Sequence, residues 1–281
     1  MKQALRVVAF NFLCELSMIP AIAQTPEDVL RSPDICSVRL SILRQRLDAV
    51  WTAEQRAAAA AKAKSWKCYA PEPGHPTLQE KRDYIERISR YATDAETRYH
   101  VPAAVIAAMG LVEAGYGFTR TAQQAHNLFG WKAPERGLTP HYVLACQDTA
   151  GEFGEADDNR CYVVFDSEQR AVDYVAGRLA SGFTANYAKA NARYQKETSA
   201  SVPVIERTQN WIAGIAKPYN WQPLNYARNI CRLMRNPVNT SDEIDADNNL
   251  YRLSAKAGEH ISLSALPADS RSCNAVTVPP K

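Results

Sequence analysis

Long apolar runs are almost absent from this 281-residue sequence. After the first 23 residues, no segment approaches the roughly 20 apolar residues that a membrane-spanning helix needs, so we expect no stable membrane insertion. An excess of charge of one sign is also missing, because 33 Lys and Arg face 30 Asp and Glu and leave a net charge of +3. Proteins that bind nucleic acid through its phosphates usually carry a strongly basic face, and we therefore expect no nucleic-acid partner.

The common sequence motifs for metals and nucleotides are missing too. The five histidines form no H-E-x-x-H, the seven cysteines include no C-x-x-C pair, and there is no Walker A or Rossmann glycine pattern. We expect neither a metal nor another cofactor. A thiol nucleophile at Cys146 with His141 as its base is conceivable, but the nearby Cys161 favours a disulfide. The composition, 46% hydrophobic and 22% charged, is that of an ordinary globular protein and disfavours disorder of the whole chain.

The first 23 residues have the pattern of an export signal. Lys2 and Arg6 give a positive start, an apolar centre follows, and Ala21-Ile22-Ala23 is a small-x-small cleavage site. Asn11 and Glu15 interrupt the apolar centre, and the alternative is an ordinary N-terminal helix. We favour a Sec-type signal peptide over 1–23, and hence a periplasmic or secreted bacterial protein.

Six cysteines remain when such a signal is removed, because Cys14 leaves with it. An even number in an oxidising compartment is typical of disulfide bonds. Chain order suggests one of the 15 possible connectivities: Cys36–Cys68 in an N-terminal hairpin, Cys146–Cys161 in the β region and Cys231–Cys273 holding the C-terminal tail.

The apolar pattern divides the rest of the chain into three parts. Residues 24–70 have helical i+3/i+4 spacing and form a helical extension, which ends in a hinge rich in proline and glycine at 71–76. A central domain covers 77–236. Residues 237–281 form a C-terminal tail, which we expect to be loosely ordered except where Cys273 holds it.

The central domain is predicted to be mainly α with a small β lobe. Thr77 and Glu80 form a capping box for its first helix, which reaches about residue 99. Pro102 suits the first turn of the next helix, which ends at Gly115 or Gly117. Val105, Ile106, Met109 and Val112 are expected to form the apolar face of this second helix. The other expected elements are an antiparallel hairpin from 142–144 and 161–165, and helices at about 168–182, 184–195, 201–215 and 223–235.

Glu113 is the residue that points most clearly to chemistry. It lies near the end of the second helix, in which no residue from Val101 to Val112 is charged. Partial burial of a carboxyl group there would raise its pKa, and a carboxyl that stays protonated near neutral pH suits a general acid. Gly115 and Gly117 allow the chain to turn sharply and leave the carboxyl facing a cleft. The alternative is a helix-terminal Glu that points into water.

Four blocks of the sequence resemble the glucosaminidase family of peptidoglycan hydrolases, glycoside hydrolase family 73. Residues 101–117 (VPAAVIAAMGLVEAGYG) are similar to the family pattern P-x-x-x-x-A-x-x-x-E-S/T-G-W/Y-G, and 125–132 (AHNLFGWK) to N-N-L-F-G. Residues 162–167 (YVVFDS) are similar to F-R-x-Y/F-D-S, and 219–227 (YNWQPLNYA) to Y-A-T-D-P-x-Y-A with one extra residue. The resemblance covers about 78–236.

This resemblance implies a lysozyme-like fold and cleavage of the β-1,4 bond after N-acetylglucosamine in peptidoglycan strands. It makes Glu113 the catalytic acid and Tyr219 an active-site tyrosine, and it assigns the shaping of the cleft floor to 127–130. Sugar rings have apolar faces that stack on aromatic side chains, and their hydroxyls need polar partners. The expected substrate-binding residues are therefore Tyr116, Asn127, Phe129, Gly130, Trp131 and Trp221. The alternative for each aromatic residue is packing in the core.

A second carboxyl group is where the sequence departs from the family. Glycosidases commonly use two, and the family often has a second Glu in the β lobe; here the region offers Asp148 and an acidic stretch at 152–158. Asp148 and Glu152 are the best candidates, although the stretch could be a solvated turn. Alternatively, the 2-acetamido oxygen of the substrate attacks its own anomeric carbon, Glu113 acts as acid and then base, and Tyr219 stabilises charge.

The sequence thus predicts an exported endo-β-N-acetylglucosaminidase that acts on peptidoglycan strands, and it does not specify protein partners. Two alternatives stay open. One is a muramidase or lytic transglycosylase, which would cut the other glycosidic bond of the same strands. The other is a non-catalytic wall-binding or assembly protein with a degenerate site.

Overall fold

The computed structural model describes residues 69–133, 141–143, 161–239 and 248–259, with separate positions before and after these ranges. The predicted signal peptide, Asp148 with the acidic stretch at 152–158, and the cysteines 36, 68 and 146 lie outside the described residues. In the N-terminal extension, the described positions between 45 and 61 are helical except for Thr52.

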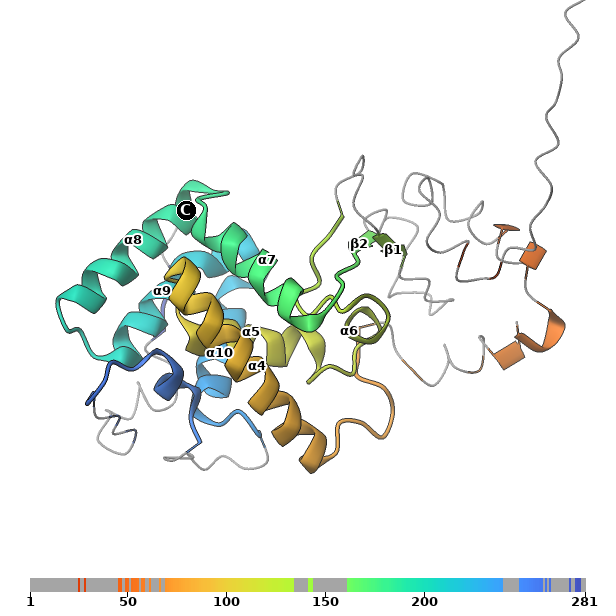
Figure 1. The fold of residues 1–281 in the computed structure, drawn as a ribbon, viewed down its shortest axis with the longest axis horizontal. Coiled ribbons are helices and arrows are strands. Elements are labelled where there is room, and N and C mark those ends of the chain that lie inside the picture. Colours follow the sequence, from red (N-terminus) through yellow and green to blue (C-terminus); the bar gives the residue numbers. More distant parts are fainter. Residues whose placement is uncertain are drawn as a thin grey trace, which may run out of the picture.

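The described chain is mainly helical, as predicted (Figure 1). Its β structure is one antiparallel pair of three-residue strands, in which His141 lies opposite Val163 and Val143 opposite Cys161. None of the helices within the described ranges is both long and apolar enough to cross a membrane. In chain order the elements are α4 (Leu78–Tyr99), α5 (Ala103–Ala114), α6 (Arg120–Ala125), β1 (His141–Val143), β2 (Cys161–Val163), α7 (Glu168–Ala180), α8 (Ala185–Ser199), α9 (Val204–Tyr219), α10 (Pro223–Arg235) and the 3-10 helix η1 (Leu250–Ser254).

Helix α5 is the central element of the domain, in contact with α4, α9, α10 and η1. Ten of its twelve residues are buried, because α5 is apolar on nearly all sides, which is the pattern of a helix surrounded by others. Val105, Ile106 and Met109 are buried as expected, but Val112 is 37% exposed because it lines a cleft. Gly110 permits the close approach of α4, because a Cβ at this position would lie 3.0 Å from Ile88 Cδ1.

The predicted helix boundaries hold to within a few residues. Thr77 and Glu80 form the capping box of α4 as expected. Pro102 is the N-cap of α5 rather than its first residue. Helix α9 continues beyond the predicted end at 215 and carries Tyr219 in its last turn, which fixes the position of that side chain.

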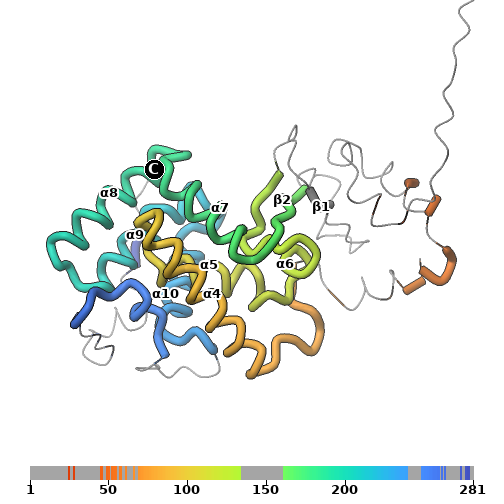
Figure 2. Tube along the Cα trace, in the orientation of Figure 1, coloured from red at the N-terminus to blue at the C-terminus, as the bar shows by residue number. Residues whose placement is uncertain are grey.

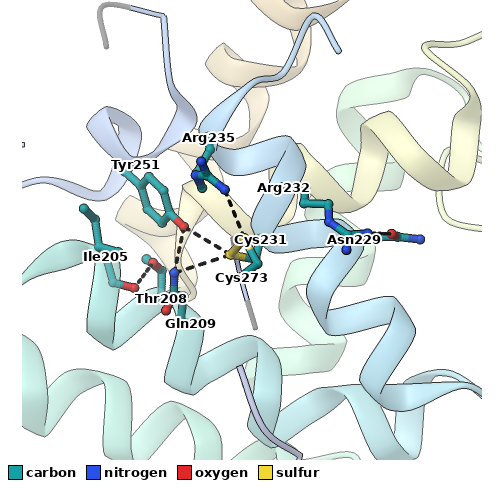
Figure 3. Close-up of a disulfide and its surroundings, with 9 residues drawn as sticks. All are labelled: Ile205, Thr208, Gln209, Asn229, Cys231, Arg232, Arg235, Tyr251 and Cys273. Carbon is teal, nitrogen blue, oxygen red and sulfur yellow. Dashed lines mark hydrogen bonds between the residues drawn. A yellow bond between two sulfur atoms is a disulfide. The ribbon is translucent and has the colours of Figure 1, made fainter. Parts of the chain in front are cut away.

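The C-terminal tail is not loosely ordered where it is described. Helix η1 packs against α4, α5, α9 and α10, and Leu250 and Tyr251 are fully buried. The Cys231–Cys273 disulfide is present as predicted, and Figure 3 shows Gln209, Arg235 and Tyr251 donating hydrogen bonds to its sulfur atoms. Cys161 is also disulfide-bonded. The tail is therefore part of the folded domain.

Replacing both Cys231 and Cys273 by Ala is expected to lower the free energy of unfolding by about 3–4 kcal/mol. The disulfide joins residues 42 positions apart, and a loop of that length restricts the unfolded chain by about this amount. Both cysteines are fully buried, so mild reductant should leave the native wild type unchanged and serves as the control. Urea denaturation monitored by circular dichroism measures the effect, and a loss below 1 kcal/mol would contradict this role.

Candidate active site

A cleft of about 720 Å³ lies where the end of α5 meets α6, β2 and the end of α9. Its volume is in the range typical of small-molecule and saccharide sites. Polar and aromatic side chains from distant parts of the sequence share its surface. The described residues that line it are Tyr69, Val112, Glu113, Thr119, Thr121, Phe129, Gly130, Trp131, Lys132, Tyr162, Phe183, Tyr187, Pro218, Tyr219, Asn220 and Trp221.

Glu113 presents its carboxyl group to this cleft from the last turn of α5. The chain then turns back through Gly115, Tyr116 and Gly117, all of which have positive φ, so the turn predicted from the two glycines is present. Burial raises the pKa of Glu113 to about 7, because the ionised form loses its hydration. Among the described residues that line the cleft, Glu113 is the only carboxyl.

A buried tyrosine, Tyr226, and a partly buried one, Tyr219, lie next to this carboxyl group. The rings of Tyr219 and Tyr226 stack with centroids 5.4 Å apart, and the Tyr219 hydroxyl donates a hydrogen bond to the Phe129 carbonyl at 3.3 Å. Burial raises the pKa of both phenols well above 10, and the charge of Glu113 adds to the increase. Both hydroxyls thus remain protonated. The proton of Tyr219 is donated to Phe129, whereas the hydroxyl of Tyr226 can donate to Glu113.

Tyr226 is a residue near the acid that the sequence reasoning missed. Its hydroxyl is buried and forms no hydrogen bond within normal distance to a described residue, but it lies near enough to Glu113 to lower the pKa of that carboxyl. The sequence contained a signal that could have identified it, because Tyr226 is the second tyrosine of the block YNWQPLNYA. Only the first tyrosine of that block, Tyr219, was assigned a role from the sequence.

Asn127 shapes the cleft floor from inside the protein. Its side chain is fully buried; the amide nitrogen donates to the carbonyls of Trp131 (2.8 Å) and Val163 (2.9 Å), and the amide oxygen accepts from the Trp131 backbone at 2.8 Å. The amide therefore joins the loop 127–131 to β2. It is out of reach of a ligand, so its expected contact with a sugar is replaced by an internal structural role.

Tyr116 is also placed away from the cleft. Its ring is 9% exposed, packs edge-on against Tyr84, and its hydroxyl donates to the Pro237 carbonyl at 2.7 Å. For this residue the alternative of core packing applies. Of the other predicted site residues, six line the cleft: Glu113, Phe129, Gly130, Trp131, Tyr219 and Trp221.

A carboxyl group that holds its proton near neutral pH, in a cleft walled by aromatic rings, is what a glycoside hydrolase requires, and the chain is of this class. The family model for glucosaminidase, described as mannosyl-glycoprotein endo-beta-N-acetylglucosaminidase, matches residues 89–237, more than half of the chain. The chain belongs to the glucosaminidase family, and the resemblance found in its sequence is confirmed at that level.

Three solved structures are similar to this chain. The catalytic domain of the autolysin Auto from Listeria monocytogenes has 18% sequence identity and a TM-score of 0.41, and the match covers 66% of this chain and 94% of that chain. A C-terminally truncated glycoside hydrolase domain of FlgJ from Salmonella typhimurium has 18% identity and a TM-score of 0.37, and the match covers 53% of this chain and 92% of that chain. An N-acetylmuramoyl-L-alanine amidase from Staphylococcus aureus has 15% identity and a TM-score of 0.42, and the match covers 70% of this chain and 48% of that chain. A comparison with curated proteins gave no match.

Proposed function

We propose that this protein is an exported endo-β-N-acetylglucosaminidase that cleaves the glycan strands of peptidoglycan. The observation that carries the proposal is Glu113, a cleft carboxyl whose burial raises its pKa to about 7, within a domain of the glucosaminidase family. The substrate class follows from the family resemblance of the four sequence blocks and from the aromatic walls of the cleft.

Glu113 acts first as the general acid in this proposal. It donates its proton to the glycosidic oxygen as the bond to the anomeric carbon breaks, which leaves the carboxylate ready to take a proton from the incoming water. The protonated phenol of Tyr226 stabilises the carboxylate formed in the first step. A proton is therefore lost and regained at one residue during each turnover.

The second group in the reaction has two candidates. One is a carboxylate outside the described residues, with Asp148 and Glu152 as the proposed positions. The other is the 2-acetamido oxygen of the substrate, which would attack the anomeric carbon itself. Glu113 is the only carboxyl among the described lining residues, and both candidates stay open.

Export of the chain is part of the proposal. Disulfide bonds at Cys231–Cys273 and at Cys161 are typical of proteins that fold in oxidising compartments. They agree with the signal peptide proposed for 1–23 and with a substrate outside the cytoplasm.

Product analysis tests the proposed activity. Purified sacculi are digested with the wild-type protein, and the soluble fragments are identified by mass spectrometry before and after borohydride reduction. Reducing-end N-acetylglucosamine is the expected result. Reducing-end N-acetylmuramic acid would indicate a muramidase, and 1,6-anhydromuramic ends would indicate a lytic transglycosylase. Binding to sacculi with no soluble product would overturn the assignment and favour a wall-binding protein.

A further inference from the structure

The segment just before α4 packs against the domain that follows it. This N-terminal strap, defined as Trp66 and residues 69–76, lies outside the region matched by the family model. The Glu72 backbone donates to the Phe118 carbonyl at 2.9 Å, and the His75 ring stacks on Phe118 with centroids 4.8 Å apart. Figure 2 shows this part of the chain passing beside α6 before it enters α4.

Two further contacts fix the strap at its N-terminal side. Trp66 is 2% exposed, and the guanidinium of Arg120, the first residue of α6, lies 4.7 Å from its ring centroid and donates to its carbonyl. Pro71 packs against Gly115 so closely that a Cβ on Gly115 would lie 2.6 Å from Pro71 Cγ. Gly115 is two residues after Glu113, so the strap is attached at the acid end of the cleft.

Tyr69 lies between these two anchors and lines the cleft. It is 50% exposed, so part of its surface is accessible at the cleft. Among the described Phe, Tyr and Trp residues, two others are exposed, Phe183 (60%) and Trp221 (85%). Both line the same cleft, so the exposed rings of these three residue types gather at one site.

We propose that Tyr69 is a substrate-binding residue and that the N-terminal strap adds a saccharide subsite to the cleft. The ligand chemistry is the apolar face of an N-acetylated hexosamine ring, which stacks on the exposed ring of Tyr69. The contacts of Trp66 and Pro71 restrain the chain near Tyr69 before substrate binds, which reduces the entropy lost on binding. The inference rests on the proposed function, because it assumes a glycan ligand.

Binding of peptidoglycan glycan strands without stem peptides tests the subsite. Affinity is measured by calorimetry in a Glu113→Gln background, where no cleavage occurs. Adding Tyr69→Ala should weaken the Kd about five- to tenfold, whereas Tyr69→Phe, which keeps the ring face, should stay within about twofold of the parent. Leu78→Ala is the matched control, because Leu78, the first residue of α4, is 45% exposed but lies outside the cleft lining, and it should leave the Kd unchanged.

Kinetics separate binding from catalysis and from folding. With Glu113 present, Tyr69→Ala should raise KM by the same factor, while kcat and the melting temperature stay close to the wild-type values. An unchanged Kd in Tyr69→Ala, or a Tyr69→Phe variant as weak as Tyr69→Ala, would overturn the stacking subsite while the wild type still cleaves strands. Failure of the parent to bind strands, with no cleavage by the wild type, would overturn the proposed function and this inference together.

Discussion

Replacing Glu113 by Gln should lower kcat on glycan strands at least about 100-fold. Gln has nearly the same shape and can donate a hydrogen bond, but it cannot give a proton to the leaving oxygen, and general acid catalysis typically contributes 10²- to 10⁴-fold. Release of soluble muropeptides from sacculi, followed by chromatography, measures the change. Glu206→Gln is the matched control, because Glu206 is exposed in the first turn of α9 and should leave the rate unchanged.

The stability of the same variant has a predictable pH dependence. The pKa of Glu113 is raised from 4.5 to about 7 in the folded protein, so the folded state binds the proton more tightly than the unfolded state. The wild type therefore loses stability as the pH rises from about 4.5 to 7, by up to about 3 kcal/mol. In Glu113→Gln the side chain at this position has no charge at any pH. The variant should therefore be as stable as the wild type near pH 4 and more stable than the wild type at pH 8.

The activity of the wild type should respond to the same proton. Because Glu113 must be protonated to act as an acid, kcat/KM should fall as the pH rises above about 7. Full activity of Glu113→Gln, or a difference in melting temperature that does not change with pH, would contradict the role assigned to this carboxyl.

Local sequence signals predicted the parts of this protein whose structure depends on a few neighbouring residues. The capping box at Thr77 and Glu80 and the helix end at Gly115 each depend on residues within one helical turn. The spacing of these residues in the sequence was therefore sufficient to predict where α4 begins and α5 ends. Glu113 was found for a similar reason, because a single charge at the end of an apolar helix is visible in the sequence. The burial of α5 on nearly all sides could have been predicted as well, since its residues before Glu113 are all uncharged and mostly apolar.

Features that depend on distant parts of the chain were not predictable in this way. Tyr69 lies in the cleft because Trp66 and Pro71 pack against α6 and Gly115, which are more than 40 positions away in the sequence. Asn127 is buried because its amide is bonded to β2, although an exposed amide would have the same sequence pattern. The lysozyme-like arrangement, the second carboxyl and the pairing of the other cysteines stay predictions.

The C-terminal tail is the clearest example, because its polar sequence gives no sign that it completes the core. Its attachment depends on Glu259, which accepts hydrogen bonds from both terminal nitrogens of Arg207 at 2.8 Å and from the backbone of Val204 and Lys256. The Arg207 side chain is only 1% exposed. A tail residue thus neutralises a charge inside the domain that precedes it.

Glu259→Gln is therefore expected to reduce the free energy of unfolding by about 3–5 kcal/mol at pH 7. The variant leaves the Arg207 guanidinium buried without its counter-charge. Removing one partner of a buried ion pair typically lowers the free energy of unfolding by this amount. Urea denaturation monitored by circular dichroism gives the value. Glu86→Gln, at an exposed position on α4, should change stability by less than 0.5 kcal/mol and provides the control.

The pH dependence of this effect identifies the ion pair as its cause. Hydrogen bonding to Arg207 lowers the pKa of Glu259 from 4.5 to about 2, so its contribution is complete above pH 4.5 and is lost as the pH falls towards 2. The difference between the wild type and Glu259→Gln should shrink over the same interval. The double variant Arg207→Leu/Glu259→Leu should recover part of the loss, because it removes both charges together. A double variant less stable than Glu259→Gln would instead mean that the bonds from Arg207 to the carbonyls of Val202 and Ser254 hold the tail more strongly than the ion pair.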